Sequence, residues 1–440
     1  MINIEFTPEK DGIVAGEENT FEVLLRASSD LMRPTVSDKK LPLNLALVLD
    51  RSGSMQGRPL EEAKKCAAML VDRMGEDDML SVTTYDSRVD VIIPTTKVVD
   101  KSRLKDRINQ IQPGGMTALY DGWSIGAEQV AEFADNNSLS RVLLLSDGQA
   151  NSGLTDEETI TSHCGTMAEN GVTTSTYGLG PRFNENLMSA MATAGQGQSH
   201  YGQTADDLMD PFSEEFDLME AIIARRMRLQ VLPEVGVSFE LLNHYPTDRE
   251  GRFILPDLAY GADVWALLKI KVAKSLCEAA RGSSLRLLTS TIDFIDPDGN
   301  EVRTAPSVMT IELHSPDAYA ELTMDDTVRQ RSIELRAAML QQQAHVAARD
   351  GDWVRIDQIM EELEQLGKGN AWLKASIQRL RTYSQTRRRD DFAKEARYKS
   401  DRMRRRSVSR YENMDSYSEA SESAQPSYLR RKLEQGKKQK

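Results

Sequence analysis

The segment of residues 41–55, which reads LPLNLALVLDRSGSM, constrains the fold more than any other part of the chain. Its first half is a short block rich in Leu and Val, typical of a strand that is buried on both faces in a parallel sheet. The block stops at Asp50, and an amphipathic helix is predicted to begin near Pro59 and to cover residues 60–74. The turn between strand and helix is therefore predicted to lie at the carboxyl edge of a sheet, where open α/β sheets bind ligands.

Three polar side chains alternate along this turn. Asp50, Ser52 and Ser54 are separated by single residues, so their oxygens can point the same way. One carboxylate with two hydroxyls is a set of hard oxygen ligands, which suits Mg²⁺. Because such triplets also cap helices, the turn alone is a weak indication of a metal site.

Two later stretches supply further oxygen ligands. Residues 112–116 form a loop with two glycines, and Thr117 follows it just before a predicted helix. Residues 141–145 form a second apolar strand, which is followed by Ser146 and Asp147. Each of these oxygen donors lies at a strand end or in a glycine loop, so we expect them to converge with Asp50 on one edge of the sheet.

This combination resembles a von Willebrand factor A (VWA) domain with a complete metal-ion-dependent adhesion site (MIDAS). The Asp-x-Ser-x-Ser motif of that family falls on Asp50, Ser52 and Ser54, its separate Thr on Thr117, and its separate Asp on Asp147. The resemblance covers residues 42–222. It implies a bound divalent cation, Mg²⁺ or alternatively Mn²⁺ or Ca²⁺, with one open position that takes an Asp or Glu carboxylate from a partner protein.

The pattern of residues 41–222 is an alternation of strands and helices. Such an alternation predicts an α/β fold with a doubly wound, mostly parallel sheet and helices on both faces. The predicted helices cover residues 60–74, 101–111, 120–133, 157–170, 184–194 and 205–226.

Strands at regular spacing are predicted for residues 227–315, which indicates an antiparallel β-sandwich. Two further strands, 2–10 and 19–27, have no partner before residue 41, and an isolated hairpin is only marginally stable in water. We therefore expect residues 1–40 to complete the later sandwich, with a VWA domain of residues 41–222 inserted into it. This layout resembles bacterial VWA proteins loosely called calcium-activated-chloride-channel homologues, a name that does not imply a channel here.

The remainder of the chain is predicted to be helical and then disordered. Amphipathic helices are expected at residues 328–349, 353–366 and 372–398, as a helical hairpin or small bundle within residues 316–403. Residues 404–440 are polar, rich in Ser and basic near the end, so they are expected to form a disordered tail.

Composition limits the classes of partner and the compartment. The net charge of −13 argues against nucleic-acid binding, except through the basic tail. Three widely spaced cysteines, Cys66, Cys164 and Cys277, indicate reduced thiols. The sequence shows no signal peptide and no stretch of about 18 apolar residues that would span a membrane. We therefore expect a cytoplasmic protein, and the resemblance to bacterial VWA proteins implies a bacterial one.

These patterns favour a protein-interaction module over an enzyme. No nucleophile, phosphate-binding loop or His/Cys metal motif accompanies the five oxygen donors. The resemblance implies an adaptor or regulator in a multi-protein stress or defence system, beside an ATPase or a kinase and phosphatase. One alternative is a metal-dependent phosphohydrolase, although Ser52 stands where its second acid would be required. Another is a scaffold whose metal site is vestigial.

Overall fold

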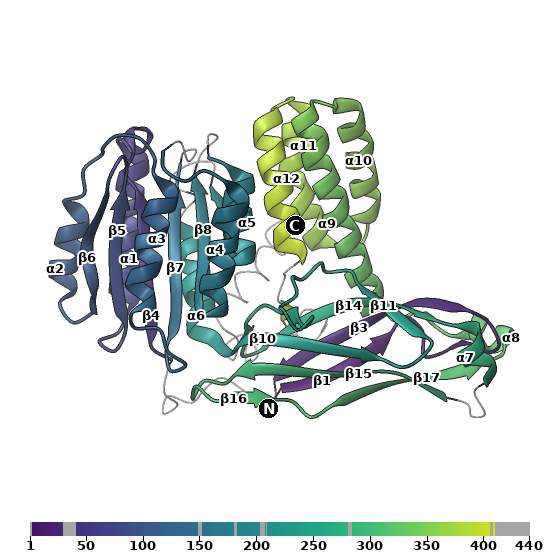
Figure 1. Cartoon of the computed structure of the whole chain (residues 1–440). Coiled ribbons are helices and arrows are strands. Elements are labelled where there is room, and N and C mark those ends of the chain that lie inside the picture. Colours follow the sequence, from purple (N-terminus) through teal and green to yellow (C-terminus); the bar gives the residue numbers. More distant parts are fainter. Residues whose placement is uncertain are drawn as a thin grey trace, which may run out of the picture.

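The computed structural model describes residues 2–29, 41–147, 152–179, 183–202, 207, 209–279, 284–404 and 408–409. These residues form three parts, which Figure 1 shows as an α/β domain, a β-sandwich and a bundle of long helices that stands on the sandwich beside the α/β domain. Among the described residues, no helix combines the length and the apolar character needed to cross a membrane.

The α/β domain is built on a six-stranded sheet with the order β6-β5-β4-β7-β8-β9. All neighbouring pairs are parallel except β5 and β6, which form an antiparallel hairpin at one edge. The strands are β4 (Leu43–Asp50), β5 (Met79–Tyr85), β6 (Val89–Lys97), β7 (Leu139–Ser146), β8 (Val172–Leu179) and β9 (Gln196–Gly202). The predicted doubly wound, mostly parallel sheet is confirmed.

Helices cover both faces of this sheet because the central strands are apolar on both sides. Leu45 and Leu47 pack into a core with α1, α2 and α6, whereas Ala46 and Val48 pack into a second core with α3, α4 and α5. The helices of the first face are α1 (Arg58–Arg73), α2 (Lys101–Asn109) and α6 (Met209–Ala221), and those of the second are α3 (Leu119–Ala131), α4 (Glu157–Glu169) and α5 (Glu185–Ala194).

The sandwich is built from the segments of the chain that precede and follow the α/β domain. In its first sheet β3 lies between β1 and β14, and the register pairs Ser28 with Asp263 and Asn19 with Val272. The strands of this sheet are β1 (Ile2–Pro8), β3 (Asn19–Ser29), β14 (Ala262–Val272), β11 (Val237–Leu241) and the short β18 (Val408–Ser409). The N-terminal strands thus complete the later sheet, and the α/β domain is inserted into the sandwich as predicted.

The second sheet packs against the first across a shared apolar core. Its order is β12-β10-β15-β17-β2, with β13 and β16 paired at its margins. The strands are β10 (Ile222–Pro233), β12 (Phe253–Ile254), β13 (Leu258–Ala259), β15 (Ser284–Ile295), β16 (Glu301–Arg303), β17 (Ser307–His314) and β2 (Ile13–Val14), and a short helix, α7 (Lys274–Ala279), follows β14.

The prediction of one helix over residues 205–226 was wrong at its end. Helix α6 ends at Ala221, and β10 begins at Ile222 without an intervening loop. Ile223 and Met227 are buried in the core of the sandwich, and β10 pairs with β15. Packing against a second sheet therefore overrides a sequence with good helical character.

Within the described residues 326–404, the C-terminal helices form a bundle of four long helices, not three. The predicted helix of residues 372–398 is interrupted: the Arg388 N–H donates to the carbonyl of Tyr383, and Arg387 has a left-handed φ of 52°. No glycine or proline marks this turn, so the sequence pattern missed it. The helices are α8 (Pro316–Glu321), which is short and precedes the bundle, and α9 (Asp326–Asp350), α10 (Trp353–Leu366), α11 (Ala371–Gln385) and α12 (Arg389–Arg404).

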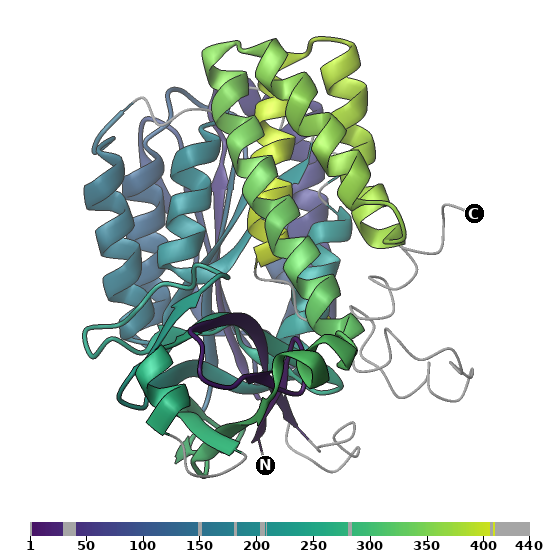
Figure 2. The same cartoon turned by 90° about the vertical axis from the view of Figure 1, so that its right-hand side faces the viewer.

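The bundle contacts both other parts of the molecule. Helix α9 packs on β3 and β14 of the sandwich, and α12 packs on β9 and α5 of the α/β domain, as Figures 1 and 2 show from two sides. Most of the predicted disordered tail lies outside the described residues. The described part, residues 408–409, pairs with Asp263 and Ala262 in β14, so the prediction of disorder from residue 404 does not hold there.

Candidate metal centre

Asp50 and Ser146 stand side by side at the carboxyl edge of the sheet. Strands β4 and β7 pair in register up to Leu49 and Leu145, so the residue after each pair emerges at the same level. Asp50 is fully buried: its Oδ1 accepts a hydrogen bond of 2.8 Å from the N–H of Ser52, and its Oδ2 accepts one of 2.8 Å from the hydroxyl of Ser146. Both oxygens of this carboxylate are therefore fixed in orientation from within the domain.

The other polar side chains of the turn meet Asp147. A short 3₁₀ turn, Gly53–Met55, places the Ser52 and Ser54 hydroxyl oxygens 3.2 Å apart. The Ser54 hydroxyl donates a hydrogen bond of 2.7 Å to Oδ1 of Asp147. Four of the five sequence-predicted residues are thus joined by direct hydrogen bonds at one sheet edge.

The loop that carries Thr117 is held against this turn by its backbone. The Gly53 N–H donates to the carbonyl of Gly115 at 2.9 Å, and the Gly114 N–H donates to the carbonyl of Arg51 at 2.7 Å. Thr117 is buried in this loop. The structure therefore brings the third segment to the same edge as the other two, as the sequence pattern predicts.

Glycine is required at residue 114 because the loop passes close to an ion pair. A Cβ on Gly114 would lie 1.7 Å from Oδ2 of Asp86, and that same oxygen is 3.0 Å from Nε of Arg51. The Asp86 carbonyl also accepts from the N–H of Ala118. Asp86 and Arg51 thus fix the spacing between the turn after β4 and the loop that carries Thr117.

The charges of this edge suit a divalent cation. The pKa of Asp50 is raised to about 6. Burial is the largest cause and the negative charge of Asp147 adds to it, while hydrogen bonds from Ser52 and Ser146 oppose the rise. Two carboxylates and neighbouring hydroxyls provide hard oxygen ligands, and a bound cation would relieve the repulsion between the two acids. The residues present therefore fit the group that the family implies.

Among the described residues, no group of three or more His, Cys, Asp or Glu side chains could hold a metal ion. A cation at this edge would accordingly depend on hydroxyl oxygens as well as on Asp50 and Asp147. Ser54 is half-buried, and Met116 beside Thr117 is 56% exposed, so the edge faces solvent on this side.

Sequence reasoning missed a second polar cluster, which lies where the three parts of the molecule meet. Glu215 in α6 is buried, and it contacts Nη1 of Arg141 at 2.6 Å, Nε2 of His200 at 3.0 Å and the hydroxyl of Ser175 at 2.8 Å. Burial alone would raise the pKa of Glu215, but the charge of Arg141 and the bonds from His200 and Ser175 bring it down to about 2.

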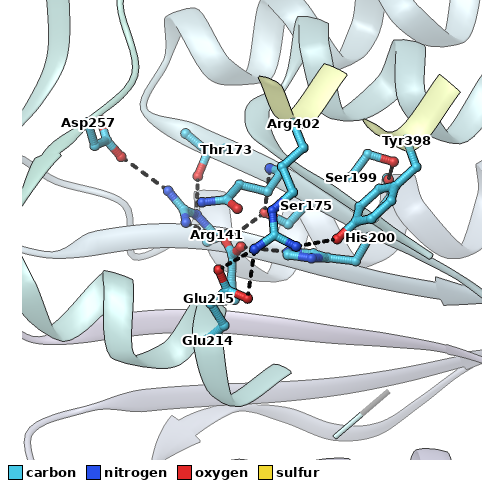
Figure 3. Close-up of polar contacts among 12 residues, drawn as sticks. Arg141, Thr173, Ser175, Ser199, His200, Glu214, Glu215, Asp257, Tyr398 and Arg402 are labelled. Carbon is cyan, nitrogen blue, oxygen red and sulfur yellow. Dashed lines mark hydrogen bonds and ion pairs between the residues drawn. The ribbon is translucent and has the colours of Figure 1, made fainter. Parts of the chain in front are cut away.

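This cluster extends from the α/β domain into both other parts, as Figure 3 shows. Arg141 also reaches Asp257 of the sandwich at 3.2 Å, and Glu214 is bound by Arg402 of α12 at 3.0 Å. A cavity of about 80 Å³ lies among these side chains. A Glu-Glu pair in an amphipathic helix and a lone His in a strand are ordinary sequence features, so no sequence signal marked this site.

Comparison with known proteins agrees with the geometry of the α/β domain. The family model of the von Willebrand factor type A domain matches residues 44–214. The uncharacterized protein sll0103 of Synechocystis is 34% identical over 204 residues, which cover 46% of this chain and 48% of that protein. The chain spans about half, or less, of the length of the curated relatives it matches.

Two solved structures are similar over most of the chain. A von Willebrand factor type A protein from Catenulispora acidiphila has a TM-score of 0.66 at 14% identity, and covers 85% of this chain and 89% of its own. The ArnB paralog VWA2 from Sulfolobus acidocaldarius has a TM-score of 0.61 at 15% identity, and covers 92% of this chain and 98% of its own. At these identities the likeness concerns the fold alone, but that fold extends beyond the α/β domain. On the family match and the sheet order, residues 44–214 of this chain form a von Willebrand factor type A domain.

Proposed function

We propose that this protein is a metal-dependent protein-interaction module, in which Asp50, Ser52, Ser54, Thr117 and Asp147 hold one divalent cation. When bound, the cation supplies a positive centre with a position open to a carboxylate of a partner protein. VWA domains are in general interaction modules of this kind, and the chain's own residues supply the oxygen ligands and their orientation.

The observation that carries this proposal is the hydrogen bond between Ser54 and Asp147. It joins the turn after β4 to the end of β7 at 2.7 Å, at an edge where Asp50 is also oriented by two hydrogen bonds. Preorganised oxygens of this kind lose little conformational entropy when they take up an ion. The set contains two formal negative charges, so Mg²⁺ would keep an attraction for a further carboxylate.

We further propose that the partner presents an Asp or Glu to the metal and that the module acts as an adaptor or regulator in the cytosol of a bacterium. The partner class suggested by the VWA resemblance is an ATPase, or a kinase and phosphatase in a stress or defence system. The net charge of −13 for the whole sequence disfavours nucleic acid as a ligand, except at the basic tail.

The direct experiment is calorimetric titration of Mg²⁺ and Mn²⁺ into the wild type and an Asp50→Asn variant, which preserves shape and removes the charge. Asp78→Asn is the matched control. Asp78 is also a buried acid of the same domain, but it accepts from the N–H of Leu43 at the opposite end of β4. We expect metal binding to be lost in Asp50→Asn and kept in Asp78→Asn; binding retained in Asp50→Asn would contradict the proposed ligand set.

Capture of partners from a native lysate with and without a chelator tests the interaction itself. Proteins retained with Mg²⁺, released by EDTA and not retained by Asp147→Ala would support metal-dependent binding. Capture that is indifferent to EDTA would refute it.

The two alternatives predict other results. A phosphohydrolase would turn over a phosphoester in a metal-dependent manner, which a broad substrate screen detects. A vestigial site would give no heat of binding and no thermal shift with either cation.

A further inference from the structure

Helix α2 and strand β6 enclose a groove at one edge of the sheet in the VWA domain. The sheet order begins at β6, which pairs with β5 on one side. Figure 1 shows α2 and β6 at the end of the domain that lies away from the bundle. The groove has a volume of about 490 Å³, and it is lined by residues of β6, of α2 and of the connection between them.

This corner of the domain is basic in a chain that is acidic as a whole. Residues 97–107 contain five Lys or Arg and two Asp, which gives a local charge of +3 against −13 for the whole sequence. Two of these cations are used by α1: Nζ of Lys101 donates to the carbonyl of Asp72 at 2.9 Å, and Nζ of Lys105 to its carboxylate at 2.7 Å. The arginines of α2 lie on a different face of the helix.

Arg103 and Arg107 line the groove, and both are exposed. Among the described residues neither has a carboxylate partner, and Nη1 of Arg107 donates instead to the carbonyl of Ile92 at 2.9 Å. The acid that lines the groove, Asp100, is the N-cap of α2 and accepts a hydrogen bond of 3.0 Å from the N–H of Arg103. Two guanidinium groups therefore keep N–H donors for an incoming carboxylate.

Apolar side chains line the groove beside these cations. Ile93 and Leu104 are almost fully buried, whereas Pro94 is exposed and Val99, which follows β6, is 65% exposed. An apolar side chain of a ligand would remove the exposed surface of Val99 from water, which is favourable through the hydrophobic effect. The groove thus offers cationic contacts from α2 and apolar contacts from the opposite wall.

The backbone of β6 offers little to a pairing strand. Pro94 has no N–H, and the N–H of Thr95 donates to Oε1 of Gln129 in α3 at 3.3 Å. The carbonyl of Ile92 already accepts from Arg107. Proline and local irregularity commonly protect edge strands from pairing. Side chains, rather than addition of a strand to the sheet, therefore determine what binds in this groove.

The spacing of the two arginines determines the form of the ligand. Residues four apart in a helix are separated by a rise of about 6 Å. In an extended peptide, alternate side chains point to the same side and lie about 6.6 Å apart, while the residue between them points to the other side. Carboxylates two positions apart can therefore meet Arg103 and Arg107 together, and the residue between them faces the apolar wall.

We propose that the groove between β6 and α2 binds an extended acidic segment of a partner protein, in which two Glu or Asp residues flank one apolar residue. The acids pair with Arg103 and Arg107, and the apolar residue packs on Val99. This goes beyond binding at the metal centre. Lys97 pairs with Met79 at the start of β5, whereas the proposed metal ligands lie at the opposite, carboxyl edge of the sheet.

Fluorescence polarisation with the full chain tests this site. The probe is a fluorescein-labelled peptide, Gly-Ser-Glu-Leu-Glu-Ser-Gly, titrated in EDTA so that a cation at the metal centre cannot take up its carboxylates. We expect saturable binding that weakens as the salt concentration rises. A Gln-Leu-Gln peptide should bind about tenfold more weakly, because two charge-assisted contacts are lost. A Glu-Ser-Glu peptide should also lose affinity, because it lacks the apolar side chain.

Charge-reversed variants place the peptide in the groove. Arg103→Glu with Arg107→Glu should lower the affinity by about tenfold, because the carboxylates then meet like charges. The matched control is Arg329→Glu with Arg336→Glu in α9. These arginines are also exposed and without a carboxylate partner among the described residues, and the change in net charge is the same. The control variant should bind the peptide as the wild type does.

The apolar contact is tested separately. Val99→Ser should weaken binding of the Glu-Leu-Glu peptide and leave binding of the Glu-Ser-Glu peptide unchanged. Val354→Ser is its control, since Val354 is 72% exposed in α10, outside the VWA domain. All the altered side chains are exposed, so thermal unfolding of each variant should match that of the wild type.

Every contrary outcome identifies a different surface. Absence of binding to the wild type, or equal loss in the two arginine variants, would overturn the proposal. Equal affinity for a labelled oligothymidylate with two phosphates would overturn it as well, because the groove would then be a general site for polyanions. Self-association in sedimentation that Arg103→Glu with Arg107→Glu abolishes would replace the acidic segment by a second copy of this chain.

Discussion

The hydroxyl of Ser146 donates a 2.8 Å hydrogen bond to Oδ2 of Asp50, and both residues are fully buried. This bond joins the end of β7 to the end of β4 and holds one of the proposed metal ligands, Asp50. The Ser52 N–H binds the other oxygen of Asp50, so the hydrogen bond from Ser146 is the second contact that fixes the orientation of this carboxylate.

Ser146→Ala should therefore weaken Mg²⁺ binding by about 10–100-fold, the usual cost of losing a group that orients a metal ligand. Ser146→Thr should restore most of the affinity, because the hydroxyl is retained. Ser81→Ala is the matched control, since its hydroxyl is buried in the neighbouring strand β5 without a hydrogen-bond partner among the described residues. Calorimetric titration measures all three variants. Equal affinities in Ser146→Ala and the wild type would show that Asp50 needs no such support.

Magnesium should stabilise the folded chain. At a concentration of one hundred times the dissociation constant, one site on the folded state adds about 2.7 kcal/mol to the free energy of unfolding. Urea titrations with and without Mg²⁺ measure this increment. Asp147→Ala removes a proposed ligand and the acceptor of the Ser54 hydroxyl, so its stability should not respond to Mg²⁺. An equal response in that variant would place the ion elsewhere.

Gly114→Ala should destabilise the domain by roughly 1–3 kcal/mol and weaken Mg²⁺ binding, because the new methyl group must displace the carboxylate of Asp86. The control is Gly165→Ala. Gly165 lies in α4, where a Cβ meets no atom within 4 Å, and there alanine should stabilise the helix by about 0.5–1 kcal/mol. In thermal unfolding, Gly114→Ala should lower the stability and Gly165→Ala should raise it. In metal titration, only Gly114→Ala should change the affinity for Mg²⁺.

Acid should destabilise the protein through Glu215. Its pKa in the folded state is lowered to about 2 from the ordinary value of 4.5, so its contribution to stability is present above pH 4.5 and is lost as the pH falls towards 2. The difference of the two values corresponds to about 3 kcal/mol. Glu215→Gln should cost roughly 3–5 kcal/mol at neutral pH, because Arg141 remains buried without its main partner.

The test for Glu215 is the slope of stability against pH. Urea titrations between pH 5 and pH 3 should show a smaller loss in Glu215→Gln than in the wild type. Parallel curves for the two proteins would show that this carboxyl has an ordinary pKa in the folded state.

The sequence predicted those parts of the structure that depend on local patterns. The apolar block before Asp50 and the alternation of strands and helices predict the sheet, because hydrophobic periodicity reflects burial. The five proposed oxygen donors were chosen because each follows a strand or a glycine loop, and the structure brings the three segments that carry them to one edge of the sheet. The two unpaired N-terminal strands were placed correctly in the sandwich, since β3 pairs with β14.

Features that depend on contacts between distant segments were missed. Helix α6 was extended too far because nothing local shows that Ile223 packs in the sandwich. The break at Arg387 carries no glycine or proline, although its φ is left-handed. The cluster around Glu215 joins residues from three parts of the chain, each unremarkable alone. Its partners are set by tertiary packing, which sequence periodicity does not encode.

The insertion of the VWA domain into the sandwich sets an order for folding during synthesis. Strand β3 leaves the ribosome before the α/β domain, but its neighbour β14 is made only after the whole α/β domain. Domains generally fold as units while the chain is still being made, so the inserted domain can reach its native state first. Until β14 has been made, β3 remains an apolar strand in an incomplete sheet, so the nascent chain carries an aggregation-prone segment while the inserted domain is synthesised.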